Sequence, residues 1–126
     1  MDKVVHFEIP VDDLERAQKF YKSIFGWKME AMPGMEYIMI GTTPIDENNM
    51  PTEPGAINGG MMKRQHPLTS PLIIIKVQNI ENAMKNVKKM GGEIVRGKTQ
   101  VGDMGYVAYV KDTEGNIIGL WQTIKE

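Results

Sequence analysis

The chain opens with a regular alternation of apolar and polar side chains. In residues 3–11, KVVHFEIPV, every second residue from Val5 is apolar, whereas His6 and Glu8 fall between these positions. A period of two is typical of a strand with one buried face. The alternation therefore predicts a strand that turns His6 and Glu8 away from the face that packs on a helix.

The pattern then changes to a helical period and returns to strands. Apolar residues in DDLERAQKFYKSIFG recur every three or four positions, and Gly26 is placed to end the helix. Proline, glycine and asparagine mark the turns between the segments that follow. These segments are predicted as two strands, a loop and a fourth strand, over residues 27–32, 36–42, 43–54 and 55–63.

The second half repeats this order. LIIIKV indicates a buried strand, NIENAMKNVKKMGG indicates a helix, and three strands are expected over residues 93–101, 105–112 and 116–124. Val11 and Val77 are 66 positions apart, and so are Gly26 and Gly92. A repeated β-α-β-β-β unit means that neither copy buries its apolar face alone.

The repeat predicts an α+β fold in one domain, residues 1–126. Module 1 is expected over residues 1–64 and module 2 over residues 70–126. Two such modules would form a curved eight-stranded sheet with a shared concave groove, and the two helices would cover the convex face.

Composition excludes several classes of site. The chain has no cysteine, so disulfides, thiolate metal sites and cysteine nucleophiles are excluded. The formal net charge is −1 and the basic residues are scattered, which argues against a nucleic-acid partner. No long apolar run indicates a signal peptide or a membrane span, so we expect a cytoplasmic protein without a membrane partner.

Two residues on the first strand are candidates for catalysis. His6 has a side chain that titrates near neutral pH, and Glu8 lies two residues further on the same face. The pair could orient a proton transfer. The alternative interpretation is a strand histidine that is hydrogen-bonded inside the cleft.

Five further residues are candidates for binding a ligand. Gly119 breaks the packing of the last strand, which leaves a gap beside the flat wall of Trp121. The alternative is that the Trp121 ring plugs the cavity. Met61 is expected to be the repeat partner of Trp121, and Tyr37 and Tyr106 are expected to be repeat partners that offer hydroxyls. Strand tyrosines that face solvent are the alternative for the last pair.

Two stretches carry a family resemblance. VVHFEIPVDDLERAQKFYKSIFGW and YVKDTEGNIIGLWQ resemble the two ends of proteins of the glyoxalase/bleomycin-resistance/extradiol-dioxygenase superfamily, which have the vicinal oxygen chelate fold. Within the superfamily the chain most resembles the subgroup of predicted enzymes related to lactoylglutathione lyase. The resemblance implies the paired β-α-β-β-β fold and, as in many members, a homodimer.

The resemblance also implies where a metal would be held. Members commonly place a His, Glu or Gln ligand on the first and last strand of each module. These positions correspond to His6, to Gly59 or Gly60, to Leu72 and to Gly119. A divalent ion needs several donors, so one imidazole does not hold it. We therefore expect no metal and no cofactor.

Three hypotheses for function follow. The first is a small-molecule protein, binding or catalytic, that works without the usual metal site and takes its ligand in the concave groove. The second is a drug-binding protein of the bleomycin-resistance type. The third is a metal-dependent lyase or dioxygenase with a displaced site at His6 and Glu8.

Overall fold

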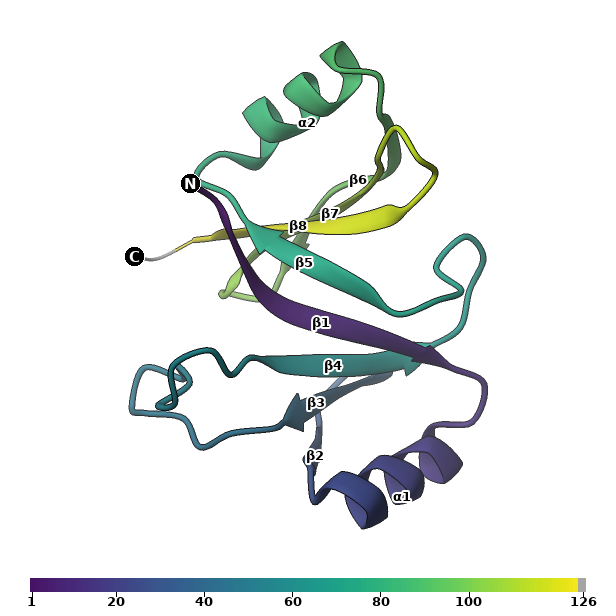
Figure 1. Ribbon diagram of the computed structural model, residues 1–126, viewed down its shortest axis with the longest axis vertical. Helices are drawn as coiled ribbons and strands as arrows, with labels where there is room; N and C mark the ends of the chain where they lie inside the picture. Colours follow the sequence, from purple (N-terminus) through teal and green to yellow (C-terminus); the bar gives the residue numbers. More distant parts are fainter. Residues whose placement is uncertain (125–126) are drawn as a thin grey trace. The chain divides into compact units, whose positions relative to one another are not determined.

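The computed structural model describes residues 1–124 and confirms the predicted α+β class (Figure 1). Its strands belong to one eight-stranded mixed sheet, and each half of the chain has the order β-α-β-β-β. The elements are β1 (Lys3–Val11), α1 (Leu14–Phe25), β2 (Lys28–Ala31), β3 (Tyr37–Gly41), β4 (Asn58–Lys63), β5 (Leu72–Lys76), α2 (Ile80–Lys89), β6 (Glu93–Val101), β7 (Gly105–Lys111) and β8 (Ile117–Thr123).

The chain divides into two compact units. Unit I comprises His6–Pro71, and unit II comprises Met1–Val5 together with the chain from Leu72 onward. The first residues of β1 belong to unit II, and the bounds of the two predicted modules, residues 1–64 and 70–126, stay predictions. That the whole chain forms one domain stays a prediction.

Unit I is a four-stranded sheet with α1 on one face. Its strand order is β2-β3-β4-β1, with β1 and β4 parallel and the other neighbours antiparallel. The apolar residues predicted on alternate strand positions pack under α1. The core cluster consists of Val11, Ile38, Ile40 and Met61, with Phe7, Ile9, Leu14, Ala17, Tyr21, Trp27 and Met29 packed against it.

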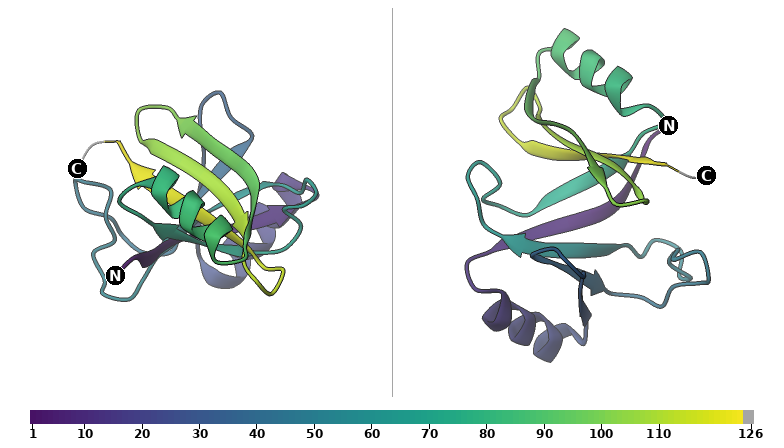
Figure 2. Two further views of the ribbon diagram at one scale, coloured as in Figure 1. Left: turned by 90° about the horizontal axis from the view of Figure 1, so that it is seen from above. Right: turned by 180° about the vertical axis from the view of Figure 1, so that it is seen from behind.

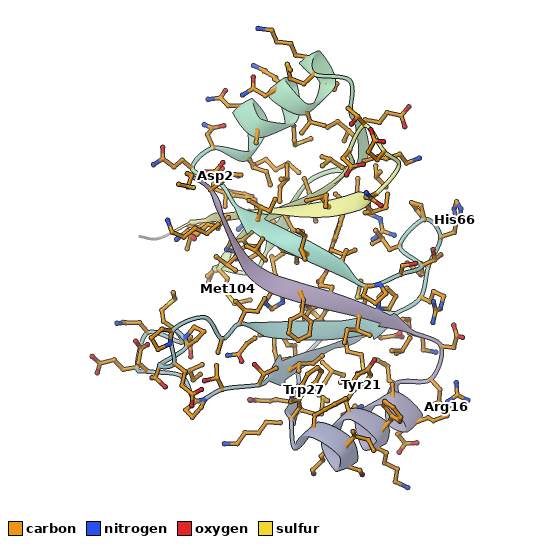
Figure 3. All side chains as sticks on the ribbon, in the orientation of Figure 1. Asp2, Arg16, Tyr21, Trp27, His66 and Met104 are labelled. Atoms are coloured by element: carbon orange, nitrogen blue, oxygen red, sulfur yellow. The ribbon has the colours of Figure 1, made fainter. Side chains whose placement is uncertain are left out.

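Capping fixes the ends of α1. The Asp13 carboxylate accepts a hydrogen bond from the Arg16 N–H at 3.0 Å, and Gly26 adopts the left-handed conformation with φ of 71°. The chain then returns toward the helix, where the rings of Tyr21 and Trp27 stack with centroids 5.2 Å apart (Figure 3). This aromatic contact ties the helix to the start of β2.

Unit II repeats this arrangement of strands and helix, and its buried core is apolar. Its strand order is β5-β8-β7-β6, with β5 and β8 parallel. Figure 2 shows α2 against the sheet strands of this unit. The buried core under α2 consists of Val77, Ile80, Ala108, Val110 and Leu120. In the part of the chain that the structure describes, neither helix is long and apolar enough to cross a membrane.

Candidate functional site

Three polar side chains meet on the face of unit I that α1 does not cover. The Tyr37 hydroxyl, from β3, donates a hydrogen bond to Oε2 of Glu8 at 2.7 Å, and it lies 3.0 Å from Nε2 of His6. His6 and Glu8 come from β1, and the side chain of Tyr37 therefore reaches across β4. Glu8 is only 4% exposed, so a charged or polar carboxyl is held inside the protein by this contact among others.

A glycine makes this arrangement possible. Gly60 lies on β4, directly beside Glu8 in the β1–β4 register. A Cβ atom at Gly60 would lie 1.7 Å from the Tyr37 hydroxyl oxygen, so no other residue leaves room for the tyrosine. A Cβ at Gly59 would instead meet the Phe7 ring at 2.5 Å, on the helix side. Of the two glycines considered from the sequence, Gly60 is thus the one on the face of His6 and Glu8.

Burial controls the charge of His6. Removal from water lowers the pKa of His6 from 6.5 to about 4, because the imidazolium form loses hydration. The ring is therefore neutral at pH 7. A neutral imidazole has one N–H donor and one bare nitrogen, which sets what the ring can do in a hydrogen-bond chain.

The structure corrects the expected positions of Met61 and Tyr106. Met61 is fully buried in the core under α1, and Tyr106 packs against the core under α2. Both side chains therefore lie on the helix side of their sheets, opposite the face expected for ligand contacts. Neither is retained as a candidate for the site.

A slip of one residue in the repeat explains both errors. Glu8 pairs with Gly60 in unit I, and Ile74 pairs with Gly119 in unit II, so the two glycines are equivalent. Met62, not Met61, then corresponds to Trp121. By the same registers Tyr37 corresponds to Val107 rather than to Tyr106, because Tyr37 pairs with Met62 and Val107 with Trp121. A shift by one residue moves a strand side chain to the other face.

The gap expected at Gly119 is filled. A Cβ atom there would lie 2.8 Å from Cγ1 of Ile74, a residue that is 4% exposed. The glycine thus accommodates a neighbouring apolar side chain, and the interpretation of an open position for a ligand is wrong. The Trp121 ring lies over β7, where a Cβ at Gly105 would meet its Cζ2 atom at 2.6 Å. Whether this ring also contacts a ligand stays a prediction.

Replacing Gly119 with alanine is expected to lower the free energy of unfolding by about 2 kcal/mol, because the added methyl overlaps Ile74. Urea unfolding of Gly119→Ala, Ile74→Ala and the double variant measures this coupling. Alanine at 119 should cost much less when Ile74 is already alanine. Equal costs in both backgrounds would contradict the contact.

The comparisons with known proteins agree with this fold. The family model for the N-terminal part of bleomycin resistance protein-like proteins matches residues 3–43. A glyoxylase-like domain-containing protein of Didymella fabae is 32% identical over 114 residues, which are 86% of this chain and 84% of that protein. The chain belongs to the glyoxalase/bleomycin-resistance/dioxygenase superfamily.

Solved structures of low sequence identity share the fold of this glyoxalase-like chain. A superfamily member from Vibrio splendidus 12B01 has a TM-score of 0.63 and 16% identity, covering 97% of this chain and 99% of that one. Methylmalonyl-CoA epimerase from Mycobacterium tuberculosis has a TM-score of 0.62 and 14% identity, covering 95% and 87%. These likenesses concern the fold alone.

The side chains of this glyoxalase-like protein do not suit a bound metal. Among residues 1–124 no group of three or more His, Cys, Asp or Glu side chains gathers to hold an ion. At the positions that the resemblance indicates, Leu72 and the two glycines, Gly60 and Gly119, supply no donor atom. In unit I the Tyr37 hydroxyl takes the space beside Gly60 and engages both His6 and Glu8. A metal at His6 and Glu8 would have to displace this tyrosine.

The sequence predicts His6, Glu8 and Tyr37 as candidates, but it does not predict how they are joined. His6 and Glu8 were expected to share a face, and the structure confirms this through their common partner Tyr37. The role of Gly60 was missed. Its signal was present in the sequence as a glycine on a central strand, which often marks the close approach of another group.

Proposed function

We propose that the chain is a small-molecule-binding protein that works without a bound metal. Its ligand lies against the face of β1, β3 and β4 that carries His6, Glu8 and Tyr37. The observation that carries this proposal is the set of hydrogen bonds through the Tyr37 hydroxyl, which joins His6 to the buried Glu8. Buried, mutually oriented polar groups fix the orientation of a ligand while apolar contacts supply affinity.

The lowered pKa of His6 supports ligand binding rather than general base catalysis. An efficient general base has a pKa near the working pH. Burial places the pKa of His6 at about 4, so the neutral ring is a weak base at pH 7. Such a ring still forms strong, directed hydrogen bonds, which is what a binding site requires.

Ligand screening by NMR tests the proposal. Backbone amides of β3 and β4 should shift when a small-molecule library is added, and His6→Ala should weaken binding about tenfold because the Tyr37 oxygen loses a partner. His66→Ala is the matched control, since that side chain is exposed. Ligands that move only amides elsewhere, or that bind His6→Ala unchanged, would overturn the proposal.

A drug-binding function of the bleomycin-resistance type is the second candidate. The observation that favours it is the family model over residues 3–43, a segment that contains His6, Glu8 and Tyr37. Titration with bleomycin separates it from the broader proposal. Shifts at β1, β3 and β4 would support this candidate, and no binding at saturating drug would remove it.

Metal analysis tests the third hypothesis, a displaced metal site at His6 and Glu8. We expect purified protein to contain far less than one zinc, nickel, iron or manganese ion per chain, because the donor set is too small. Elemental analysis before and after dialysis against a chelator measures this. About one ion per chain that resists dialysis would contradict the prediction.

The homodimer, the cytoplasmic location and the relation to lactoylglutathione lyase also stay predictions.

A further inference from the structure

The Tyr37 hydroxyl has a single proton, and its position decides the state of His6. The Tyr37 hydroxyl donates this proton to Oε2 of Glu8 at 2.7 Å, and a tyrosine hydroxyl donates only once. The hydroxyl oxygen is then left as an acceptor. In the 3.0 Å contact between this oxygen and Nε2 of His6, the hydrogen therefore comes from Nε2.

The neutral ring of His6 can carry only one N–H. Because Nε2 holds it, Nδ1 is a bare acceptor. No hydrogen bond to Nδ1 is formed within residues 1–124, and the side chain of His6 is half-buried. The chain of contacts therefore ends at a lone pair on His6.

We infer that Tyr37 and Glu8 lock His6 in the Nε2–H tautomer, so that the site selects ligands that donate a hydrogen bond to Nδ1. This inference rests on the proposed function and names its ligand class. The ligand is a small molecule with an O–H or N–H group at this point. A ligand carboxylate or ether oxygen has no hydrogen to offer there, so it meets the lone pair of Nδ1 unfavourably.

The tautomer is measured first, without any ligand. Long-range ¹H–¹⁵N correlation spectra of the ¹⁵N-labelled protein at pH 7 should show the N–H of His6 on Nε2 and a bare Nδ1. Tyr37→Phe removes the acceptor and should abolish this preference, whereas Gly97→Ala, a strand substitution with nothing described within 4 Å of the added methyl, should leave it unchanged. A proton on Nδ1 in the parent protein, or an unchanged preference in Tyr37→Phe, would overturn the inference.

Ligand selection is measured with phenol and anisole, which differ by a methyl group on the oxygen. Phenol should shift the Nδ1 resonance of His6 and bind about fivefold more tightly than anisole, the gain of one neutral hydrogen bond. No Nδ1 shift with phenol, or equal shifts with both, would overturn the donor-ligand inference. If both compounds still move the amides of β3 and β4, the proposed binding site stands while the tautomer inference fails. If no amide of these strands moves, both fail.

Discussion

Replacing Gly60 with alanine is expected to lower the free energy of unfolding by about 4 kcal/mol. The new Cβ atom would lie 1.7 Å from the Tyr37 hydroxyl oxygen and 2.0 Å from its Cζ, so the ring has to leave its position. Overpacking alone costs about 1–3 kcal/mol. The loss of the hydrogen bonds to His6 and Glu8 adds about 1–3 kcal/mol, because the Glu8 carboxyl is buried.

Chemical denaturation of Gly60→Ala, Gly97→Ala, Tyr37→Ala and the double variant at residues 37 and 60 checks this effect. Gly97→Ala is the matched control, because that glycine also lies in a strand and nothing described lies within 4 Å of its added methyl. A second background, Tyr37→Ala, removes the side chain that alanine at 60 displaces. In that background, Gly60→Ala should lower the free energy of unfolding only slightly. If it costs as much without Tyr37 as with it, the explanation by the tyrosine is wrong.

Lowering the pH from 7 to 4 is expected to remove about 3 kcal/mol of stability through His6 alone. Burial depresses the pKa of His6 from 6.5 to about 4. Between these values the unfolded chain binds a proton that the folded protein does not, so stability falls as the pH falls. The loss begins near pH 6.5 and levels off below about pH 4, and each pKa unit corresponds to about 1.4 kcal/mol.

The contribution of His6 is measured as the difference in unfolding free energy between the parent protein and a variant that does not titrate at this position. His6→Gln keeps an amide N–H that can donate to the Tyr37 hydroxyl but does not titrate. Denaturant unfolding at intervals from pH 7 to pH 4 should show a stability difference between parent and variant that shrinks as the pH falls. For His66→Gln, which changes an exposed histidine, the free energy of unfolding should vary with pH as it does for the parent. A constant difference between parent and His6→Gln would rule out the depressed pKa.

The fold and the shared face of His6 and Glu8 follow from local patterns. Alternation in residues 3–11 places His6 and Glu8 on one face because strand side chains alternate strictly. Asp13 and Gly26 end the first helix by chemistry that is visible in the sequence. These predictions depend only on neighbours along the chain, which explains why they are confirmed.

Pairing between strands was harder to predict, because it depends on loop lengths. The repeat offset is 66 residues at Val11 and Val77, but it is 59 at Gly60 and Gly119. The long connection over residues 42–57 has a counterpart of only residues 112–116. A sequence comparison without the hydrogen-bonded register cannot fix such an offset to one residue, and one residue is enough to turn Met61 to the wrong face.

Gly60 and Gly119 also constrain which substitutions this chain accepts, because a neighbouring side chain occupies the place of a Cβ atom at each. A carboxylate introduced at Gly119 collides with Ile74 through its first side-chain atom, and any side chain at Gly60 collides with Tyr37. A metal-binding descendant must therefore lose the bulky neighbour before it gains the ligand, since the reverse order passes through a destabilised protein. For Gly60 the mutation that must come first replaces Tyr37. That replacement also removes the hydrogen bonds of Tyr37 to His6 and Glu8. A metal ligand at Gly60 would thus require the loss of the polar contacts among His6, Glu8 and Tyr37.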